Sequence, residues 1–319
     1  MLFIFFVTLI ITKRLLMNAL EITNLTKKFE KITAVDNATF SVPEGSVFGL
    51  IGRNGAGKTT TLRMMMNIYQ PDSGEIVFRG QKIGQDFKDS VGYLPEERGL
   101  YKKMKVMDTL IFLSELKGKN GKEVEKRAND YLERFELTDR KNSKVEDLSK
   151  GNQQKIQFIS TILHDPEFLI FDEPFAGLDP INTNLLRQII LEMKNEGKVI
   201  IFSTHLMDFA EKMCDNIAMI DRGKIILNGE LDEIKKKFAN RNVSINYEGD
   251  ISFLKGNPII ESMEDFGNTT GIKVKKPEQV QELLKLLVDR KVVVKKFNAD
   301  EISLHEIFIS LAGKEATGV

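Results

Sequence analysis

The feature that most constrains this chain is a glycine-rich loop at residues 52–60, GRNGAGKTT, which directly follows the apolar run VFGLI at residues 47–51. The loop fits the pattern G-x-x-x-x-G-K-[ST], and good helix formers follow it, so it lies between a predicted strand and a predicted helix. Its glycines let backbone N–H groups close around phosphate oxygens, and the N-terminus of the helix adds positive potential. The chain is therefore predicted to build an α/β domain around a phosphate-binding loop.

The residues of this loop are predicted to contact a nucleotide. The ammonium group of Lys58 can reach the β- and γ-phosphates, and the hydroxyl of Thr59 can bind Mg²⁺. The predicted nucleotide-binding residues of the loop are Gly52, Arg53, Asn54, Gly55, Ala56, Gly57, Lys58, Thr59 and Thr60.

A second chemical motif follows the apolar run FLIF at residues 168–171. This predicted strand ends in two carboxylates, Asp172 and Glu173, and charged groups at the mouth of a buried strand cost free energy unless they have a partner. Alone, such a pair is more often part of a solvated loop, but the phosphate-binding loop upstream favours a functional interpretation. Asp172 is predicted to hold Mg²⁺, commonly through water, and Glu173 to act as the general base that polarises the attacking water.

Strands and helices alternate from Ala19 onward, which predicts a largely parallel sheet. Apolar residues at helical spacing over residues 105–135 predict a helical insert, which we place at about residues 100–160. Other strands are expected at about 19–29, 37–42, 75–80, 168–171 and 199–202 and as a pair near 217–228, and other helices at about 57–68, 150–163 and 181–195.

The composition changes near residues 230–241, where a charged predicted helix breaks at Asn240. We therefore expect a first domain at residues 17–238 and a second at residues 241–319. The second contains three predicted strands and two predicted helices but no recognisable chemical motif. It is predicted to be a small α+β accessory domain.

The first residues of the chain do not have a globular pattern. Residues 1–12 carry no charge and are followed by Lys13 and Arg14, but the run is shorter than the roughly 20 apolar residues that a membrane-spanning helix needs. Met17 is a second plausible start, so one interpretation of residues 1–16 is a start site assigned too early. The alternative is an apolar extension that anchors the chain at a membrane interface.

The charge balance argues against one class of protein, and the cysteine content indicates the compartment. Lys plus Arg and Asp plus Glu both number 46, and the pI is about 6.9, which argues against a protein that binds nucleic acid through a broad basic face. The only cysteine, Cys214, cannot form an internal disulfide, which indicates a reducing, cytoplasmic compartment. His164 and His305 are expected to be structural.

Further motifs occur in a fixed order along the chain. They are Phe29, the run Tyr93-Leu94-Pro95-Glu96-Glu97-Arg98, the run Leu148-Ser149-Lys150-Gly151-Asn152-Gln153-Gln154, the run Gly177-Leu178-Asp179-Pro180, and Ser203-Thr204-His205. With these motifs the chain resembles the ATP-binding subunit of an ABC transporter over about residues 19–230. The resemblance implies a P-loop NTPase fold of ABC type for the first domain, with ATP and Mg²⁺ as cofactors.

The resemblance also implies roles for single residues. Phe29 would stack on adenine, Glu96 in the Q-loop would face Mg²⁺, and His205 would be the switch histidine that assists catalysis. Two such domains would pair head to tail, so that Ser149 and Gly151 of the signature motif reach the γ-phosphate of ATP held by the other subunit. Asp179 would belong to the D-loop, and Ser149 is also expected to cap the helix that follows it.

Two motifs depart from the usual pattern of this family. The Q-loop has Glu96 where glutamine is usual, and the signature has Lys150 in place of glycine and Asn152 in place of glutamine. These forms and the C-terminal appendage are similar to a subgroup that includes sodium-efflux and drug-efflux ATPases. Export is therefore the expected direction of transport.

The resemblance implies two protein partners, a separate integral membrane permease and a second ATPase subunit, identical or different. Such a chain would lie at the cytoplasmic face of the cell membrane and hydrolyse ATP to drive transport, with no nucleic-acid partner. Two alternatives are a soluble ABC ATPase of translation or DNA repair and a regulatory ABC protein without useful turnover. The first usually has two ATPase units or long insertions, and the second is disfavoured by Glu173 and His205.

Overall fold

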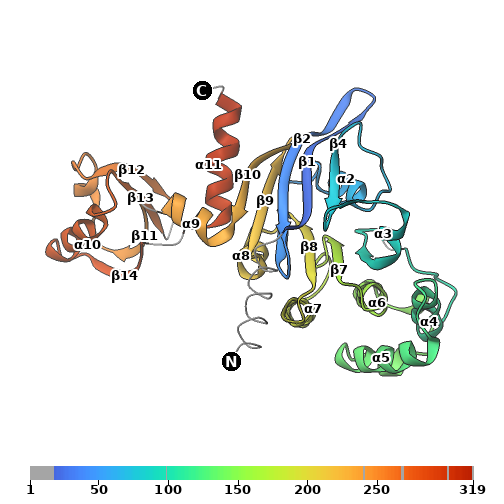
Figure 1. Cartoon of the computed structure of the whole chain (residues 1–319). Helices are drawn as coiled ribbons and strands as arrows, with labels where there is room; N and C mark the ends of the chain where they lie inside the picture. The colour runs from blue at the N-terminus through green and yellow to red at the C-terminus, as the bar shows by residue number, and fades with distance from the viewer. Residues whose placement is uncertain (1–17, 98, 240, 267–268, 300–301, 318–319) are drawn as a thin grey trace, which may run out of the picture. The chain divides into compact units, whose positions relative to one another are not determined.

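The computed structural model describes residues 18–97, 99–239, 241–266, 269–299 and 302–317 (Figure 1). The chain divides into two compact units, with unit 1 ending at Asn228 and unit 2 beginning at Gly229. The division lies about ten residues before the boundary expected at 238–241, because helix α9 (Leu231–Ala239) packs against strand β11 (Asn242–Glu248) of unit 2. The predictions for residues 1–16 lie outside the described residues. Within the described ranges, no helix is both long enough and apolar enough to cross a bilayer.

Unit 1 contains a six-stranded sheet with the strand order β10-β9-β3-β8-β7-β6 (Figure 1). Strand β3 pairs in parallel with β8 and β9, and β7 pairs in parallel with β8 and β6, which confirms the predicted parallel sheet. Every residue of β3, β7 and β8 is buried, as expected for central strands with apolar runs. The strands are β3 (Val47–Ile51), β6 (Val91–Leu94), β7 (Phe168–Asp172), β8 (Val199–Thr204), β9 (Asn216–Asp221) and β10 (Lys224–Glu230).

The register of this sheet brings the chemical motifs together. Ile51 pairs with Thr204, and Asp172 pairs with Ser203, so the carboxyl ends of β3, β7 and β8 share one edge. The glycine-rich loop leaves β3 at this edge and leads into α2 (Lys58–Met65). Ligands of open parallel sheets bind at such carboxyl edges.

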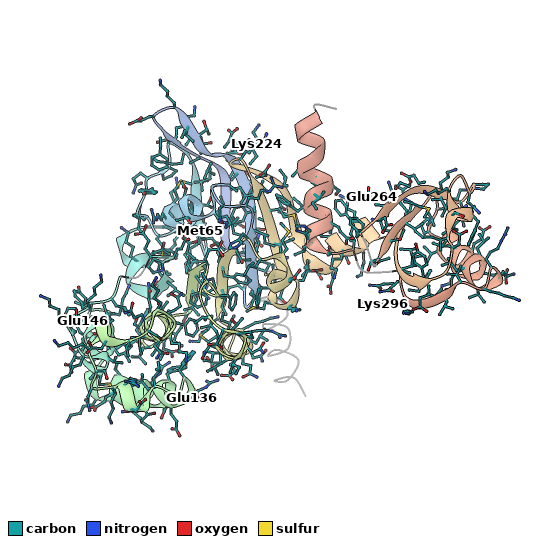
Figure 2. All side chains as sticks on the ribbon, turned by 180° about the vertical axis from the view of Figure 1, so that it is seen from behind. Met65, Glu136, Glu146, Lys224, Glu264 and Lys296 are labelled. Atoms are coloured by element: carbon teal, nitrogen blue, oxygen red, sulfur yellow. The ribbon has the colours of Figure 1, made fainter. Side chains whose placement is uncertain are left out.

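A second, antiparallel sheet has the order β2-β1-β4-β5, with β1 (Asn18–Phe29), β2 (Ile32–Pro43), β4 (Ser73–Phe78) and β5 (Gln81–Lys82). One apolar core joins the two sheets and α2. It includes Leu20 of β1, Phe48 of β3, Ile170 of β7 and Met65 of α2, all almost fully buried. Figure 2 labels Met65. Ala56 of the glycine-rich loop belongs to the same core, which ties the loop to both sheets.

The predicted helical insert is present as α4 (Val106–Glu115), α5 (Gly121–Arg134) and α6 (Lys150–Ile162), with α4 packed against both α5 and α6. Helix α5 begins after Asn120, whose side chain accepts a hydrogen bond from the Lys122 amide, and it buries Val124, Ala128 and Leu132. The remaining helices of unit 1 are α3 (Gln85–Ser90), α7 (Pro180–Asn195) and α8 (Met207–Met213).

Unit 2 is built on an antiparallel sheet with the order β12-β13-β11-β14 and helix α10 packed against it. Its core includes Ile245, Ile272, Leu283 and Leu287, which confirms a small α+β domain. Strand β12 (Ile260–Asp265) was not predicted, because at the sheet edge it is half-buried at most and its charged residues hide the alternation. The other elements are β13 (Thr270–Val274), α10 (Gln279–Asp289), β14 (Val293–Asn298) and α11 (Leu304–Thr317).

Candidate nucleotide-binding site

The glycine-rich loop has a backbone that only glycine fits at two positions. Gly57 has φ +111°, and a Cβ atom there would lie 2.4 Å from the carbonyl oxygen of Ala34. A Cβ atom at Gly52 would lie 2.2 Å from the carbonyl oxygen of Ile220. Gly57 is the N-cap of α2 and supplies no side-chain hydrogen bond, so N–H groups of the first helical turn remain available for an anion.

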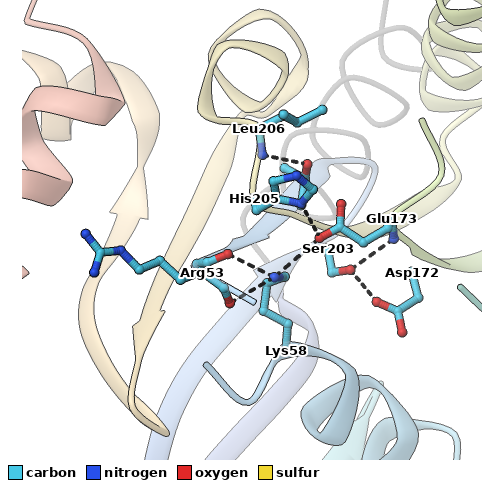
Figure 3. A network of polar contacts seen from close by, with 9 residues as sticks. Arg53, Lys58, Asp172, Glu173, Ser203, His205 and Leu206 are labelled. Atoms are coloured by element: carbon cyan, nitrogen blue, oxygen red, sulfur yellow. Dashed lines mark hydrogen bonds and ion pairs between the residues drawn. The ribbon is translucent and has the colours of Figure 1, made fainter. Parts of the chain in front are cut away.

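Lys58 carries a buried positive charge at the base of this loop (Figure 3). Its Nζ donates hydrogen bonds to the carbonyl oxygens of Gly52, at 2.9 Å, and Arg53, at 3.2 Å. The same Nζ lies 3.3 Å from Oε1 of Glu173. The loop therefore holds this ammonium group in one place.

Asp172 is fully buried at the end of β7. Ser203 donates a hydrogen bond to its Oδ1, whereas Oδ2 is buried and has no hydrogen-bond partner among the described residues. Burial raises the pKa of Asp172, and the hydroxyl groups of Ser203 and Thr59 oppose that shift. An unpartnered carboxylate oxygen near a threonine hydroxyl suits a hard cation that prefers oxygen ligands, so these residues fit Mg²⁺.

Glu173 is buried, and its backbone lies in the left-handed region with φ +49°. Its Oε1 lies 3.0 Å from Nδ1 of His205, and Figure 3 shows both side chains beside Lys58. The Thr204 hydroxyl accepts a hydrogen bond from the Leu206 amide and so orders the turn that carries His205. A non-glycine residue with positive φ costs free energy that the surrounding structure must supply, and such residues cluster at functional sites.

A cavity of about 520 Å³, within the range typical of small-molecule sites, opens beside these groups. Of the predicted residues, Asn54, Gly55, Gly57, Lys58, Thr59, Thr60, Glu96 and Glu173 line it. Gly52, Arg53, Ala56, Asp172 and His205 are not among its lining residues. Gly52, Arg53 and Ala56 lie in the glycine-rich loop. Asp172 and His205 lie at the carboxyl ends of β7 and β8.

The cavity also has a wall that sequence reasoning missed. Ile32, Thr33 and Ala34 of β2 line it, together with Arg222 and Gly223 of the turn between β9 and β10. Gly223 donates a hydrogen bond to the Ala56 carbonyl and accepts one from the Asp36 amide, which joins this turn to the glycine-rich loop and to β2. No local motif indicates this wall, because its parts are about 190 residues apart in the sequence.

Phe29 does not line the cavity. Its half-exposed ring makes an edge contact with Tyr69, with a centroid distance of 5.3 Å, and Nζ of Lys27 lies 5.5 Å from the Phe29 centroid. The stacking of Phe29 on adenine therefore stays a prediction.

The signature and D-loop residues lie outside the cavity of their own chain. Ser149 caps α6 by accepting a hydrogen bond from the Asn152 amide, as predicted. Asp179 caps α7 and accepts hydrogen bonds from the backbone amide and the side chain of Asn182 and from the Ile181 amide, which lower the pKa of Asp179. A Cβ atom at Gly151 would lie 3.8 Å from the Gly177 carbonyl oxygen, so the two motifs are close neighbours.

Comparison with known proteins agrees with this geometry. A model of the family described as "ABC transporter" matches residues 35–176, and one described as "ATP-binding protein DrrA1-3-like, C-terminal domain" matches residues 229–312. An ABC transporter ATP-binding protein of Bacillus subtilis, YhaQ, is 44% identical over 92% of this chain and 98% of its own length. Nod factor export ATP-binding protein I of Rhizobium etli is 29% identical over 95% of this chain and 96% of its own length.

A solved structure described as the ATP-binding subunit of an ABC transporter is 31% identical, with a TM-score of 0.65. It matches 69% of this chain and 93% of its own chain. The predicted P-loop α/β fold of ABC type and the family resemblance are thereby confirmed. The chain belongs to the family of ATP-binding subunits of ABC transporters.

Proposed function

We propose that this chain hydrolyses ATP in the presence of Mg²⁺ and that hydrolysis drives export through a separate membrane permease. The observation that carries the proposal is the position of Glu173, whose carboxylate lies between Lys58 and His205 at the edge of the cavity. A carboxylate in this position can accept a proton from a water molecule that attacks the γ-phosphate.

Each group of residues in the site has its own proposed role in phosphoryl transfer. The N–H groups of the glycine-rich loop and Lys58 bind and orient the phosphates, and the γ-phosphate competes with Glu173 for the Lys58 ammonium. Thr59 and Asp172 would hold Mg²⁺, with Glu96 facing it from the cavity wall. The metal would neutralise charge that develops on the phosphate oxygens. His205 holds the Glu173 carboxylate in place.

Two chains are proposed to form the complete site. Ser149 and Gly151 lie outside the cavity of their own chain, and Asp179 lies in the segment next to them. We propose that these residues complete the site of a second ATPase subunit. Hydrolysis then depends on closure of the pair, because each catalytic site needs groups from both chains.

Export is proposed from the similarity to a Nod factor export protein along nearly the whole chain. The subunit would then lie at the cytoplasmic face of the membrane, bound to its permease. Purification of the tagged chain from detergent-solubilised native membranes tests this arrangement. A stoichiometric integral membrane protein should copurify, whereas recovery with ribosomes or DNA-repair proteins and without a membrane partner contradicts it.

A further inference from the structure

Helix α6 lies unusually close to strand β6 and to the loop that follows it. A Cβ atom at Gly92 would lie 2.6 Å from the carbonyl oxygen of Thr161, so only glycine permits this approach of the two backbones. The Thr161 hydroxyl donates to the Gln157 carbonyl oxygen of its own helix at 2.9 Å and lies 3.4 Å from the Tyr93 carbonyl oxygen. These contacts fix the position of α6 along β6.

One turn of helix earlier, Gln157 points into the loop that carries Glu96. The Nε2 group of Gln157 donates hydrogen bonds to the carbonyl oxygens of Pro95, at 3.4 Å, and Glu97, at 3.1 Å. These carbonyls lie on either side of Glu96 in the sequence. Because both groups are acceptors, only the NH₂ end of the amide can face them, so the orientation of Gln157 is determined by its surroundings.

Burial alone does not favour a glutamine at this position. Gln157 is 4% exposed, and its Oε1 is buried without a hydrogen-bond partner among the described residues. A buried acceptor without a partner costs free energy, and an apolar side chain of similar length would avoid that cost. The two hydrogen bonds to the loop are therefore the feature that distinguishes Gln157 from a residue that only fills space.

The loop residue between those two carbonyls faces the nucleotide site. Glu96 is exposed and lines the cavity together with Thr59 and Glu173. Helix α6, from which Gln157 projects, begins at the Ser149 cap. One buried amide thus joins the loop that carries Glu96 to the helix that carries the signature motif.

We propose that Gln157 is a positioning residue that holds Glu96 at the nucleotide cavity and thereby sets how tightly the site binds Mg²⁺ with a nucleotide. The inference rests on the proposed role of Glu96 beside Mg²⁺. Outer groups that orient a metal-facing residue commonly change metal affinity by about 10–100-fold when removed.

The test compares two buried polar residues of the same helix. Gln157→Met keeps the length of the side chain and removes both hydrogen bonds to the Glu96 loop. Lys155→Met is the matched control, since Nζ of Lys155 also donates to a carbonyl oxygen outside the helix, that of Phe135, at 3.2 Å. Binding of a fluorescent ATP analogue by the full chain is measured as a function of Mg²⁺ concentration.

We expect Gln157→Met to raise the Mg²⁺ concentration at half-maximal binding by about tenfold, as for other residues that orient a metal-facing group, and Lys155→Met to leave it within about twofold of the wild type. Gln157→Glu, which turns an acceptor toward the two carbonyls, should raise it further. In the background of Glu96→Ala the additional effect of Gln157→Met should disappear, because a positioning residue acts only through the group that it positions.

An unchanged Mg²⁺ midpoint in Gln157→Met, or the same shift in Lys155→Met, would overturn the inference. So would a Gln157→Met effect that persists in full after Glu96→Ala. The proposed function is tested separately by Lys58→Ala, which should abolish nucleotide binding at every Mg²⁺ concentration. Retained binding in that variant contradicts the proposed function itself.

Discussion

The hydroxyl of Ser203 donates a hydrogen bond to Oδ1 of Asp172 over 2.5 Å. The two residues lie opposite each other on the neighbouring strands β8 and β7. This bond orients a buried carboxylate whose other oxygen, Oδ2, has no hydrogen-bond partner in the described part of the chain. Ser203 thereby determines which oxygen of this carboxylate is left without a protein partner.

Ser203→Ala should weaken Mg²⁺-dependent nucleotide binding. Loss of the orienting hydrogen bond is expected to raise the Mg²⁺ concentration at half-maximal binding by about tenfold. This is the lower end of the effect of removing a group that orients a metal-facing residue. A Mg²⁺ titration of nucleotide binding measures it. Ser46→Ala is the control, because Ser46 is a buried serine whose hydroxyl donates to the Pro43 carbonyl and has no part in the site. Equal titration curves for Ser203→Ala and Ser46→Ala would contradict the role of Ser203.

Glu173→Gln should abolish hydrolysis and preserve nucleotide binding. The amide keeps the shape of the side chain but cannot accept the proton of the attacking water, and loss of a general base typically lowers the rate by about 10²–10⁴-fold. Phosphate release and nucleotide binding are measured on the same preparation, and size-exclusion chromatography with ATP should reveal a trapped pair of subunits. Glu167 is an exposed carboxylate directly before the first residue of β7, so Glu167→Gln should retain hydrolysis. Near-normal turnover by Glu173→Gln would refute the assigned base.

Arg222→Asn should weaken nucleotide binding about fivefold, which corresponds to about 1 kcal/mol. Arg222 lines the cavity and has φ +45°, and asparagine tolerates this left-handed conformation, so the substitution removes the charge while it keeps the turn. Lys224→Asn is the matched control, since Lys224 is an exposed cation two residues away that pairs with Asp36 and does not line the cavity (Figure 2). If both variants lose affinity equally, the effect belongs to the general charge of this surface and not to Arg222.

Acid should destabilise unit 1 through His164. Burial lowers the pKa of His164 to about 4, and its Nε2 is buried without a hydrogen-bond partner among the described residues. An unfolded chain has a histidine pKa of about 6.5, so the stabilising contribution is complete above pH 6.5 and falls as the pH decreases toward 4. Between pH 7 and pH 5 the free energy of unfolding should decrease by about 2 kcal/mol from this group.

Urea unfolding followed by circular dichroism at the two pH values measures this loss. His164→Gln cannot titrate and should remove about 2 kcal/mol of the pH dependence, whatever its own stability at pH 7. The same pH dependence in His164→Gln and in the wild type would exclude His164 as the cause.

Much of the candidate site could be predicted from short segments of sequence. The glycine-rich loop is recognisable because a strand, a tight turn and a helix N-terminus are all specified by neighbouring residues. The same holds for Asp172 and Glu173 after a fully apolar strand, and for the Ser149 cap of α6. Such features depend on contacts between residues close in the sequence, so pattern alone identifies them.

Other features depend on which strands become neighbours. The bond from Ser203 to Asp172 exists because β8 pairs with β7, and Arg222 reaches the cavity because β9 pairs with β3. The edge strand β12 and the boundary at Asn228 likewise follow from packing within unit 2.

The sequence by itself determined the family and the P-loop fold of this protein and the residues of the candidate site, because a few short motifs specify backbone geometry and residue type. Only the tertiary structure decided which side chains support that chemistry. Gln157 on α6 bonds to the loop of Glu96, and the two are about 60 residues apart in the chain. The physical reason is that hydrogen bonds between distant segments require a defined register of strands and helices, and that register results from burial of the common core.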